Sequence, residues 1–259
     1  MTRVGCVPYL NAYPLVARTT LDVHYAVPTE LPPLLANREV AAILVSSIVG
    51  LRTPSARVVK GACVGSFGPV HSVRLFSKVP LHKIRSLALD QSSMTSNTLA
   101  QILLKELHGI QPVAIAEPPE LSKMLSKHDA ALLIGDNGMR ADGTGLHIMD
   151  LGDAWTNWTG LPFVWAMWLG GQDLTPEIAD HLVIARKQAV ANLDEVVPEA
   201  VERFGFTEEV TRHYLSKTMT YDFDARHEAA LRVFGEFALA HGVITEMCMP
   251  EWVSGELAV

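Results

Sequence analysis

The sequence predicts an α/β protein built from two lobes, with a ligand cleft between them and a helical C-terminal part. Strand and helix patterns alternate along the first 45 residues, which is typical of a parallel sheet. A second alternating series begins near residue 84, and the pattern after residue 174 is almost entirely helical. The chain has 259 residues, which exceeds the usual length of a single domain.

The N-terminal series consists of short apolar strands separated by helical segments. Turn residues at Gly65–Pro69 separate its last two strands. The expected strands are Val4–Leu10, Leu21–Val27, Val40–Val45, Ala56–Val64 and Ser72–Ser77, and the expected helices are Tyr13–Arg18 and Glu30–Asn37.

The second series is a smaller α/β unit. Its longest helix follows the segment Ser92–Ser96 and ends at His108, because Gly109 is suited to the left-handed position after a helix. The other expected elements are strands Ile84–Asp90, Val113–Ala116 and Ala130–Ile134, and helix Pro119–Lys127.

The C-terminal part returns the chain to the first lobe. We expect helices at Thr175–Ala191, Asp194–Phe204, Thr207–Leu215 and Asp224–His241, with Asp224 as the N-cap of the last one. The first lobe would then comprise residues 1–74 and 165–259, and the second lobe residues 75–164. Hinges are expected near residues 72–78 and 160–168.

Composition excludes several classes of function. The formal charge is −7 and no Lys/Arg cluster occurs, so nucleic acid is not an expected partner. No apolar run reaches the length of a membrane-spanning helix, and the N-terminus lacks the pattern of a secretory signal. We therefore expect a cytoplasmic protein that does not bind a membrane; its oligomeric state is not predicted.

The cysteines do not indicate a disulfide or a metal site. Cys6, Cys63 and Cys248 are widely spaced, and none has a histidine at ligand spacing. No dinucleotide or phosphate-binding motif occurs either. The sequence predicts no metal and no cofactor.

Polar side chains directly follow four of the expected strands. Asn11 follows the first, Ser46 and Ser47 follow the third, Ser92–Ser96 begin the second lobe's long helix, and Asp136 follows Ile134. The strand ends of open α/β sheets face the ligand crevice, so these residues are candidates for binding. The alternative is that each is an ordinary helix cap.

The segment Asp90–Ser96 has more hydroxyls than a cap requires, and a small carboxylate would use the surplus at the helix N-terminus. Two further candidates are His71, which lies beside a turn near an expected hinge, and Trp155, whose ring could stack on a flat ligand. For Trp155 the alternative is core packing, and for His71 it is a solvated histidine.

Several segments resemble the chorismate dehydratase family of the futalosine route to menaquinone. The resemblance spans nearly the whole chain, although the Gly138-Met139-Arg140 loop departs from the family pattern. It rests on Val7-Pro8-Tyr9-Leu10-Asn11-Ala12-Tyr13-Pro14-Leu15, Gly65-Ser66-Phe67-Gly68-Pro69-Val70-His71-Ser72-Val73, Ser92-Ser93-Met94-Thr95-Ser96, Leu133-Ile134-Gly135-Asp136, and residues 155–164.

This resemblance implies a type II periplasmic-binding-protein-like fold, of the kind that closes like a Venus flytrap. It also implies a carbon-oxygen lyase that converts chorismate, a dicarboxylate, to 3-[(1-carboxyvinyl)oxy]benzoate without a cofactor, the substrate's own side-chain carboxylate taking the proton. Asn11 would be the catalytic residue. The residues expected to bind the substrate are Ser46, Ser47, Ser66, Ser72, Ser92, Thr95, Ser96 and Asp136.

Two alternatives remain open at this stage. The same fold delivers or senses small anions in many proteins that catalyse nothing. The sister enzyme that forms dihydroxynaphthoate shares the fold and would use a general base, for which His71 is the candidate to examine.

Overall fold

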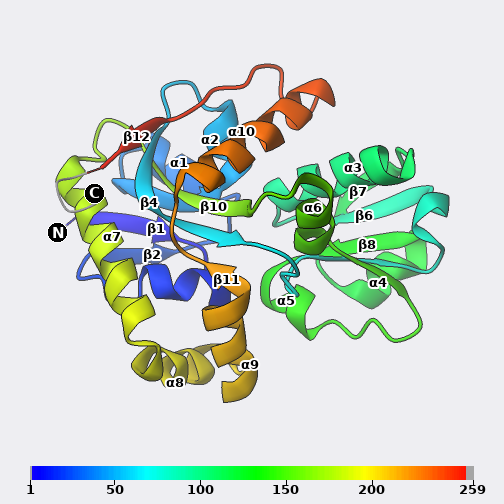
Figure 1. Ribbon diagram of the computed structural model, residues 1–259, viewed down its shortest axis with the longest axis horizontal. Helices are drawn as coiled ribbons and strands as arrows, with labels where there is room; N and C mark the ends of the chain where they lie inside the picture. The colour runs from blue at the N-terminus through cyan, green and yellow to red at the C-terminus, as the bar shows by residue number, and fades with distance from the viewer. Residues whose placement is uncertain (1, 255–259) are drawn as a thin grey trace.

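The computed structural model describes residues 2–254, which form two β-sheets with helices packed around them (Figure 1). The larger sheet has the strand order β11-β4-β10-β3-β1-β2, with β12 paired to β4. Its strands are β1 (Arg3–Cys6), β2 (Asp22–Tyr25), β3 (Ala42–Ser46), β4 (Arg57–Ser66), β10 (Phe163–Gly170), β11 (Met219–Thr220) and β12 (Glu251–Val253).

The smaller sheet has the order β7-β6-β8-β5-β9, and in Figure 1 it lies to the right of the larger one. Its core is parallel, since β6 pairs in parallel with β7 and β8, whereas β5 is antiparallel to β8 and β9. The strands are β5 (Arg74–Ser77), β6 (Ser86–Asp90), β7 (Val113–Glu117), β8 (Ala130–Leu133) and β9 (His147–Asp150).

The helices divide between the two sheets in chain order. None within residues 2–254 is long and apolar enough to cross a bilayer. The 3₁₀ and α segments are η1 (Leu10–Leu15), α1 (Leu31–Ala36), α2 (Ser47–Arg52), η2 (Leu81–Lys83), α3 (Thr95–His108), α4 (Leu121–Lys127), α5 (Gly135–Arg140), α6 (Leu151–Thr159), α7 (Pro176–Ala191), α8 (Leu193–Phe204), α9 (Glu208–His213) and α10 (Ala225–Ala240), and η3 (Tyr214–Thr218) is a π-helix.

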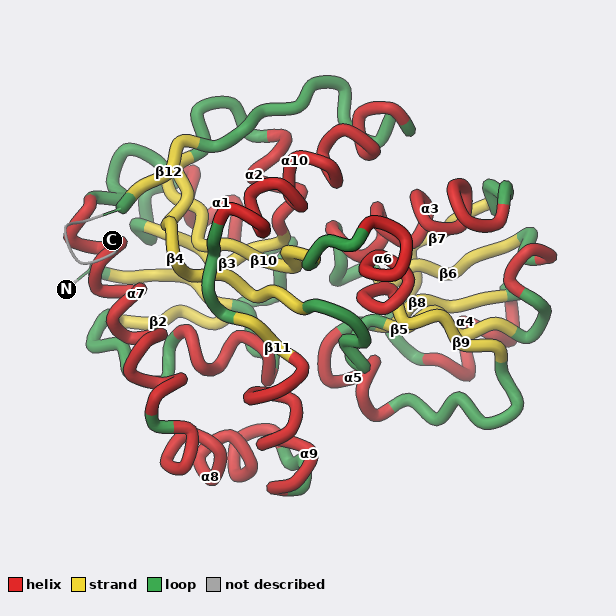
Figure 2. The backbone as a smooth tube through the Cα atoms, viewed as in Figure 1, coloured by secondary structure: helices red, strands yellow, loops and turns green. Residues whose placement is uncertain are grey.

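The chain passes between the sheets twice. It leaves the larger sheet after β4, builds the smaller sheet, and returns after α6 into β10. Figure 2 shows both connections as loops between the two sheets. The α/β class, the two sheets and the helical C-terminal part agree with the sequence prediction, while the lobe boundaries and hinges remain predictions.

Local sequence signals explain where several elements end. Gly109 adopts φ 67° at the end of α3, as predicted for a left-handed cap. The carboxylate of Asp224 accepts hydrogen bonds from the N–H groups of Arg226 and His227, which confirms it as the N-cap of α10. These two ends are decided by residues close together in the sequence.

The first strand is shorter than predicted. We expected Val4–Leu10, but β1 ends at Cys6 and the chain then enters η1 at Leu10. Pro8 has no N–H to donate to a neighbouring strand, which limits extension of the ladder. Asn11 consequently lies inside η1 and does not simply precede a helix.

The most consequential missed element is β10. We predicted no strand after Ala130–Ile134, but Phe163–Gly170 is an interior strand antiparallel to both β3 and β4. Its eight residues form a continuous apolar run between Gly160 and Gly171, a pattern that is typical of a strand buried on both faces.

Trp155 belongs to an aromatic cluster in the core. Its ring meets Phe163 and Phe234 edge to face, with centroids 5.2 and 6.3 Å apart, and the side chain is fully buried. Its indole N–H donates to the carbonyl of Pro162 at 3.0 Å. The cluster joins α6, β10 and α10, so Trp155 has the packing role that was the alternative to ligand stacking.

We expect Trp155→Ala to lower the free energy of unfolding by about 3 to 5 kcal/mol, because it leaves a large cavity in the core. Trp158→Ala is the matched control, since Trp158 lies in the same helix but is only partly buried. Urea denaturation followed by circular dichroism measures both. Equal losses in the two variants would contradict the central place of Trp155 in the core.

Candidate functional site

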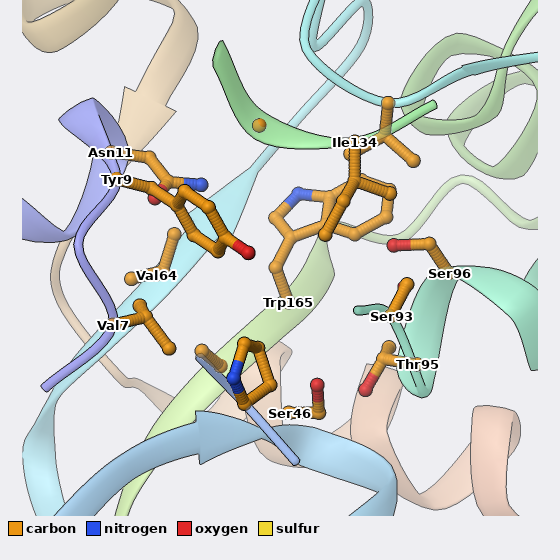
Figure 3. A pocket seen from close by; sticks show the side chains of 14 residues that line it. Val7, Tyr9, Asn11, Ser46, Val64, Ser93, Thr95, Ser96, Ile134 and Trp165 are labelled. Carbon is orange, nitrogen blue, oxygen red and sulfur yellow. The ribbon is translucent and has the colours of Figure 1, made fainter. Parts of the chain in front are cut away.

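A pocket lies between the two sheets, and both contribute to its walls (Figure 3). The larger sheet supplies the segment after β1, the end of β3 and parts of β4 and β10. The smaller sheet supplies the start of α3 and the segment after β8. The lining residues are Val7, Tyr9, Asn11, Pro28, Ser46, Val64, Val73, Ser93, Thr95, Ser96, Ile134, Gly135, Trp165 and Ala166.

Four of the residues singled out in the sequence line this pocket: Asn11 from η1, Ser46 at the end of β3, and Thr95 and Ser96 in the first turn of α3. They come from opposite sides of the cleft, as Figure 3 shows. The strand-end rule found them because the ends of β1, β3 and β6 all face the space between the sheets.

Three other predicted serines lie in the walls of the pocket without lining it. Ser47 is fully buried, and its hydroxyl donates to the carbonyl of Val164 at 2.7 Å. The hydroxyl of Ser66 accepts a hydrogen bond from the indole N–H of Trp165 at 2.9 Å. Ser72 Oγ accepts from the hydroxyl of Tyr214 at 2.7 Å. Their hydroxyls are therefore engaged with the protein.

Ser92 is hydrogen-bonded to Asp90. Its hydroxyl and its N–H both donate to Asp90 Oδ1, at 2.5 and 3.0 Å, while the N–H of Ile134 donates to Oδ2 at 3.3 Å. Burial raises the pKa of this carboxyl, and the three donors oppose that rise. Asp90 thus shapes the loop that presents Ser93 and Thr95 to the pocket.

Asp136 joins the two halves of the site. Its Oδ1 accepts a hydrogen bond from the backbone N–H of Leu10, at 3.2 Å, across the cleft. Burial raises the pKa of the Asp136 carboxyl, and the Leu10 hydrogen bond and the nearby Arg140 act in the opposite direction. Asp136 does not line the pocket but holds the segment that carries Asn11.

His71 lies outside the pocket. It lines a separate hollow together with Arg74, Glu209 and His213, and its backbone N–H donates to the Asp150 carboxylate at 2.7 Å. No histidine is found among the residues described as lining the pocket.

The sequence reasoning missed three polar or aromatic residues that line the pocket: Tyr9, Ser93 and Trp165. Trp165 was missed because β10 was not predicted, although the continuous apolar run of that strand indicates a buried strand. Ser93 belongs to the cluster that we identified, but only the geometry of the loop shows that Ser93 faces the pocket and Ser92 does not. The Tyr9 ring packs against Gly135, within 3.2 Å of where a Cβ would lie.

The described lining of the pocket contains no ionisable acid or base apart from the phenol of Tyr9. Burial raises the pKa of that phenol, so it stays protonated at neutral pH. The first turn of α3 has no side chain capping it within residues 2–254, which leaves its N–H groups and the hydroxyl of Ser96 as donors. The hydroxyl of Thr95 is engaged, since it lies 3.3 Å from Ser47 Oγ and accepts from the N–H of Ile48. A helix N-terminus with hydroxyls is suited to a carboxylate.

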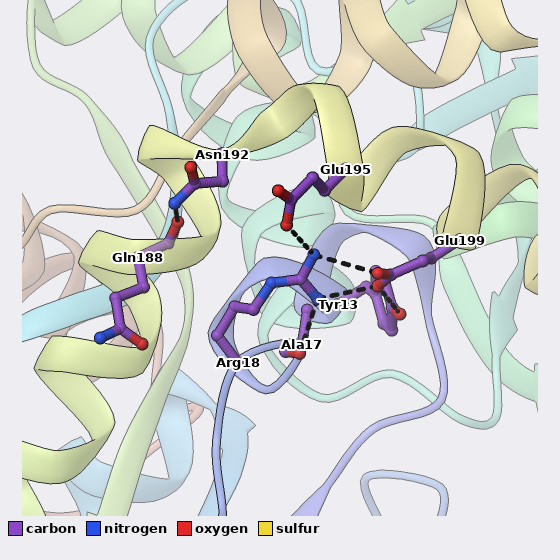
Figure 4. Close-up of polar contacts among 7 residues, drawn as sticks. All are labelled: Tyr13, Ala17, Arg18, Gln188, Asn192, Glu195 and Glu199. Atoms are coloured by element: carbon purple, nitrogen blue, oxygen red, sulfur yellow. Dashed lines mark hydrogen bonds and ion pairs between the residues drawn. The ribbon is translucent and has the colours of Figure 1, made fainter.

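η1, which carries Asn11, is held from outside by α8 (Figure 4). The Arg18 guanidinium donates to both carboxylate oxygens of Glu199, at 2.9 and 3.0 Å, and the hydroxyl of Tyr13 donates to the same group at 2.9 Å. Glu195 accepts a further bond from Arg18 at 3.3 Å. The helical C-terminal part thus anchors the backbone behind Asn11.

No cluster of three or more His, Cys, Asp or Glu side chains that could hold a metal ion occurs within residues 2–254. The donors around the pocket are amide, hydroxyl and backbone N–H groups, which suit an organic anion with several oxygens. The arrangement can orient such a ligand and stabilise negative charge on it.

A family model described as menaquinone biosynthesis matches residues 2–240. The chain belongs to this family. The curated chorismate dehydratase of Thermus thermophilus is 31% identical over 256 residues, which cover 90% of this chain and 93% of that protein. Membership of the family predicted from the sequence motifs is therefore confirmed.

Solved structures show the fold. A protein from Archaeoglobus fulgidus superposes with a TM-score of 0.71 at 19% identity, covering 93% of this chain and 98% of its own. The periplasmic aliphatic sulphonate binding protein SsuA from Escherichia coli gives 0.64 at 12% identity, over 96% of this chain and 89% of its own. The predicted periplasmic-binding-protein-like fold of this family member is confirmed.

The raised pKa of Asp136 predicts a pH effect on stability. Below about pH 4 the carboxyl is protonated in the folded and unfolded states; as pH rises, the unfolded chain ionises first, and stability is lost until the folded pKa is passed. Asp136→Asn keeps an oxygen acceptor for Leu10 but cannot ionise. Its free energy of unfolding should therefore rise relative to wild type as the pH increases above about 4.

Asp142→Asn is the opposite control. Hydrogen bonds from Thr144 lower the pKa of this exposed carboxyl, so its contribution to stability is present at neutral pH and is lost on acidification. Urea denaturation at several pH values compares the two variants. The same pH trend in both would show that burial of Asp136 is not the cause.

Proposed function

We propose that this family member is a chorismate dehydratase, which converts chorismate to 3-[(1-carboxyvinyl)oxy]benzoate and water. The relative from Thermus thermophilus supports the activity, and a pocket lined by neutral hydrogen-bonding groups supports the ligand class. The observation that carries the proposal is the convergence of Asn11, Ser46 and the uncapped start of α3 on one pocket. A dicarboxylate needs donors at both ends, and these groups lie on opposite walls.

The chemistry suits a site without a strong protein base. The hydrogen at C3 of chorismate is acidified by the ring carboxylate through the intervening C1–C2 double bond. When the C3–H bond breaks, its electron pair is delocalised over that double bond and the carboxylate. The pair then forms the C3–C4 double bond as the C4–O bond breaks, and the C4 hydroxyl leaves as water with the proton that was removed from C3. The substrate's side-chain carboxylate takes the proton from C3, and aromatisation supplies the driving force.

The protein then has two tasks, orientation of the substrate and stabilisation of charge. Asn11 orients the substrate and hydrogen-bonds the departing hydroxyl or the enolpyruvyl group. The N–H groups at the start of α3, with Ser96 and the neighbouring Ser93, receive a carboxylate. Ser46 and the Trp165 ring complete the opposite wall, while the buried hydroxyls of the other predicted serines hold the walls in place.

Contacts across the cleft support a second part of the proposal, that the lobes close over the substrate. The N–H of Ile48 donates to Thr95 Oγ1 at 3.1 Å, and the N–H of Leu10 donates to Asp136. Residues 1–74 with 165–259 would move against residues 75–164 about hinges near 72–78 and 160–168. Closure would exclude water, which competes for the same donors and could hydrolyse the vinyl ether.

We also propose that the reaction needs no metal or organic cofactor and takes place in the cytoplasm. The substrate supplies the base and aromatisation drives the elimination, so the protein has only to position and to stabilise charge. Membership of a biosynthetic family favours an enzyme inside the cell. A solute-binding function is the second candidate, because the sulphonate-binding protein shares the fold.

Incubation of chelator-treated protein with chorismate separates these functions. We expect equimolar loss of chorismate and gain of the enolpyruvyl benzoate, measured by chromatography, at the same rate with and without chelator. Binding without turnover would indicate a solute-binding protein. Turnover that disappears on chelation and returns with a metal would contradict the cofactor-free reaction.

Asn11→Ala should reduce kcat/KM for chorismate by about 100-fold or more while the protein stays folded, because removing one donor at a developing charge has effects of that size. The control is Asn37→Ala, at an exposed asparagine that ends α1 away from the pocket. Steady-state rates and thermal unfolding measure activity and folding. A normal rate in Asn11→Ala would remove this residue from the catalytic site.

A further inference from the structure

Trp165 lies at a β-bulge in β10. Val164 of β10 pairs with Gly65 of β4. The next pair joins Ala166 to Val64, so Trp165 is an extra residue in the register of these two described strands. A β-bulge changes the direction of a side chain and is frequent beside active sites. The Trp165 side chain is 6% exposed and lines the pocket (Figure 3).

Two neighbours hold the indole of Trp165 in place. Its N–H donates at 2.9 Å to the hydroxyl oxygen of Ser66, which is fully buried in the wall of the pocket. The ring of Phe163 lies against the indole, with centroids 4.4 Å apart and planes inclined by 57°. Ser66 and Phe163 are themselves partners in the ladder between β4 and β10. The ring is therefore fixed from the side of the larger sheet.

This arrangement decides what Trp165 can offer a ligand. The indole nitrogen is the only polar atom of a tryptophan side chain, and it can only donate. Because its proton is committed to Ser66, what remains toward the pocket is the carbon surface of the ring. Val64 from the larger sheet and Ile134 from the smaller one add further apolar surface to the lining. Such a surface is suited to a ring that can stack on it or meet it edge to face.

The proposed reaction changes the shape of the substrate ring. Chorismate has a cyclohexadiene ring with tetrahedral carbons at C3 and C4, whereas the ring of the product is aromatic and planar. The ring flattens as the C4–O bond breaks, so a contact that is stronger with the flat ring lowers the barrier. Asn11 and the N–H groups of α3 can bind oxygens in either ring shape. A flat aromatic face distinguishes the two shapes.

We propose that Trp165 is a specificity-determining residue whose ring face, held by the Ser66 hydroxyl, receives the six-membered ring of the ligand and binds it best when that ring is flat. The inference deepens the proposed function, on which the identity of the ring rests. Ser66 acts through Trp165 and is a positioning residue; its buried hydroxyl is not required to contact the substrate.

Two stable dicarboxylates test the preference for a flat ring without turnover. Isophthalate and cis-cyclohexane-1,3-dicarboxylate carry their carboxylates on the same ring positions, but only isophthalate is planar. We expect the wild-type protein to bind isophthalate about 3- to 10-fold more tightly, which is the effect of one aromatic contact. Isothermal titration calorimetry at neutral pH measures both affinities. Equal affinities, or no binding of either compound, would overturn the proposal.

Two substitutions of Trp165 separate ring shape from apolar bulk. Trp165→Phe keeps a smaller flat ring, and Trp165→Leu keeps an apolar side chain without a flat face. We expect the preference for isophthalate to persist in Trp165→Phe and to disappear in Trp165→Leu, with folding checked by circular dichroism. A preference that survives in a folded Trp165→Leu protein would contradict the role of the ring. If that variant does not fold, Ser66→Ala decides, because it leaves the tryptophan intact.

Ser66→Ala is compared with Ser77→Ala. Ser77 is also fully buried, but its hydroxyl donates to the carbonyl of Val79 at 2.6 Å, in the smaller sheet. The five tryptophans give five indole N–H signals in ¹⁵N-labelled protein, and that of Trp165 is assigned by its loss in Trp165→Phe. We expect this signal to shift, to exchange faster with solvent and to accompany a weaker isophthalate preference in Ser66→Ala alone. An unchanged signal in a folded Ser66→Ala protein would overturn the positioning role.

The last readout is kinetic. We expect Trp165→Leu and Ser66→Ala to lower kcat for chorismate more than they raise KM, because the lost contact is strongest with the flattened ring. Unchanged kcat in a folded Trp165→Leu protein would overturn the proposal. A wild-type protein that prefers isophthalate but does not convert chorismate would disprove the proposed function and leave ring recognition standing. Conversion of chorismate without that preference would disprove ring recognition alone.

Discussion

Thr95 Oγ1 accepts a hydrogen bond from the backbone N–H of Ile48, and this contact joins the start of α3 to the start of α2 across the cleft. Both helices follow strand ends, of β6 and β3, so the bond brings the ends of the two sheets to one place. The other contacts across the pocket depend on that approach. Asp136 can reach the N–H of Leu10, and the Tyr9 ring can cover Gly135, only while the sheets stay this close.

The side chains that line the pocket are uncharged because the two sheets lie so close together. A charged side chain in such a space would lose its hydration, and its burial would cost more free energy than a single partner returns. The acids nearby, Asp90 and Asp136, lie in the walls and accept backbone hydrogen bonds. What faces the pocket is amide, hydroxyl and aromatic surface, which suits a ligand that brings its own charges and, in the proposed reaction, its own base.

The helical C-terminal part contributes to the site from behind. α8 anchors η1 through Glu199, and the turn after α9 places the hydroxyl of Tyr214 against Ser72. Residues about 180 positions apart in the chain therefore combine to hold the segment that carries Asn11.

Sequence reasoning found the fold class and about half of the polar residues that line the pocket. Asn11, Ser46, Thr95 and Ser96 were found because strand ends face the crevice whatever the details of packing. It failed at β10, where tryptophans and glycines concealed a buried strand, and Trp165 was missed with it. It also chose Ser92 in place of Ser93, since one residue along a loop reverses which side chain faces the ligand.

The sequence by itself determined the alternation of strands and helices, the caps at Gly109 and Asp224, and membership of the family. These depend on residues that are close together in the chain or on short motifs. Only the tertiary structure decided which hydroxyls are free and which, like those of Ser47 and Ser72, are bound to distant groups. The physical reason is that a hydroxyl binds whatever partner the packing of the sheets brings within about 3 Å, and no local pattern encodes that partner.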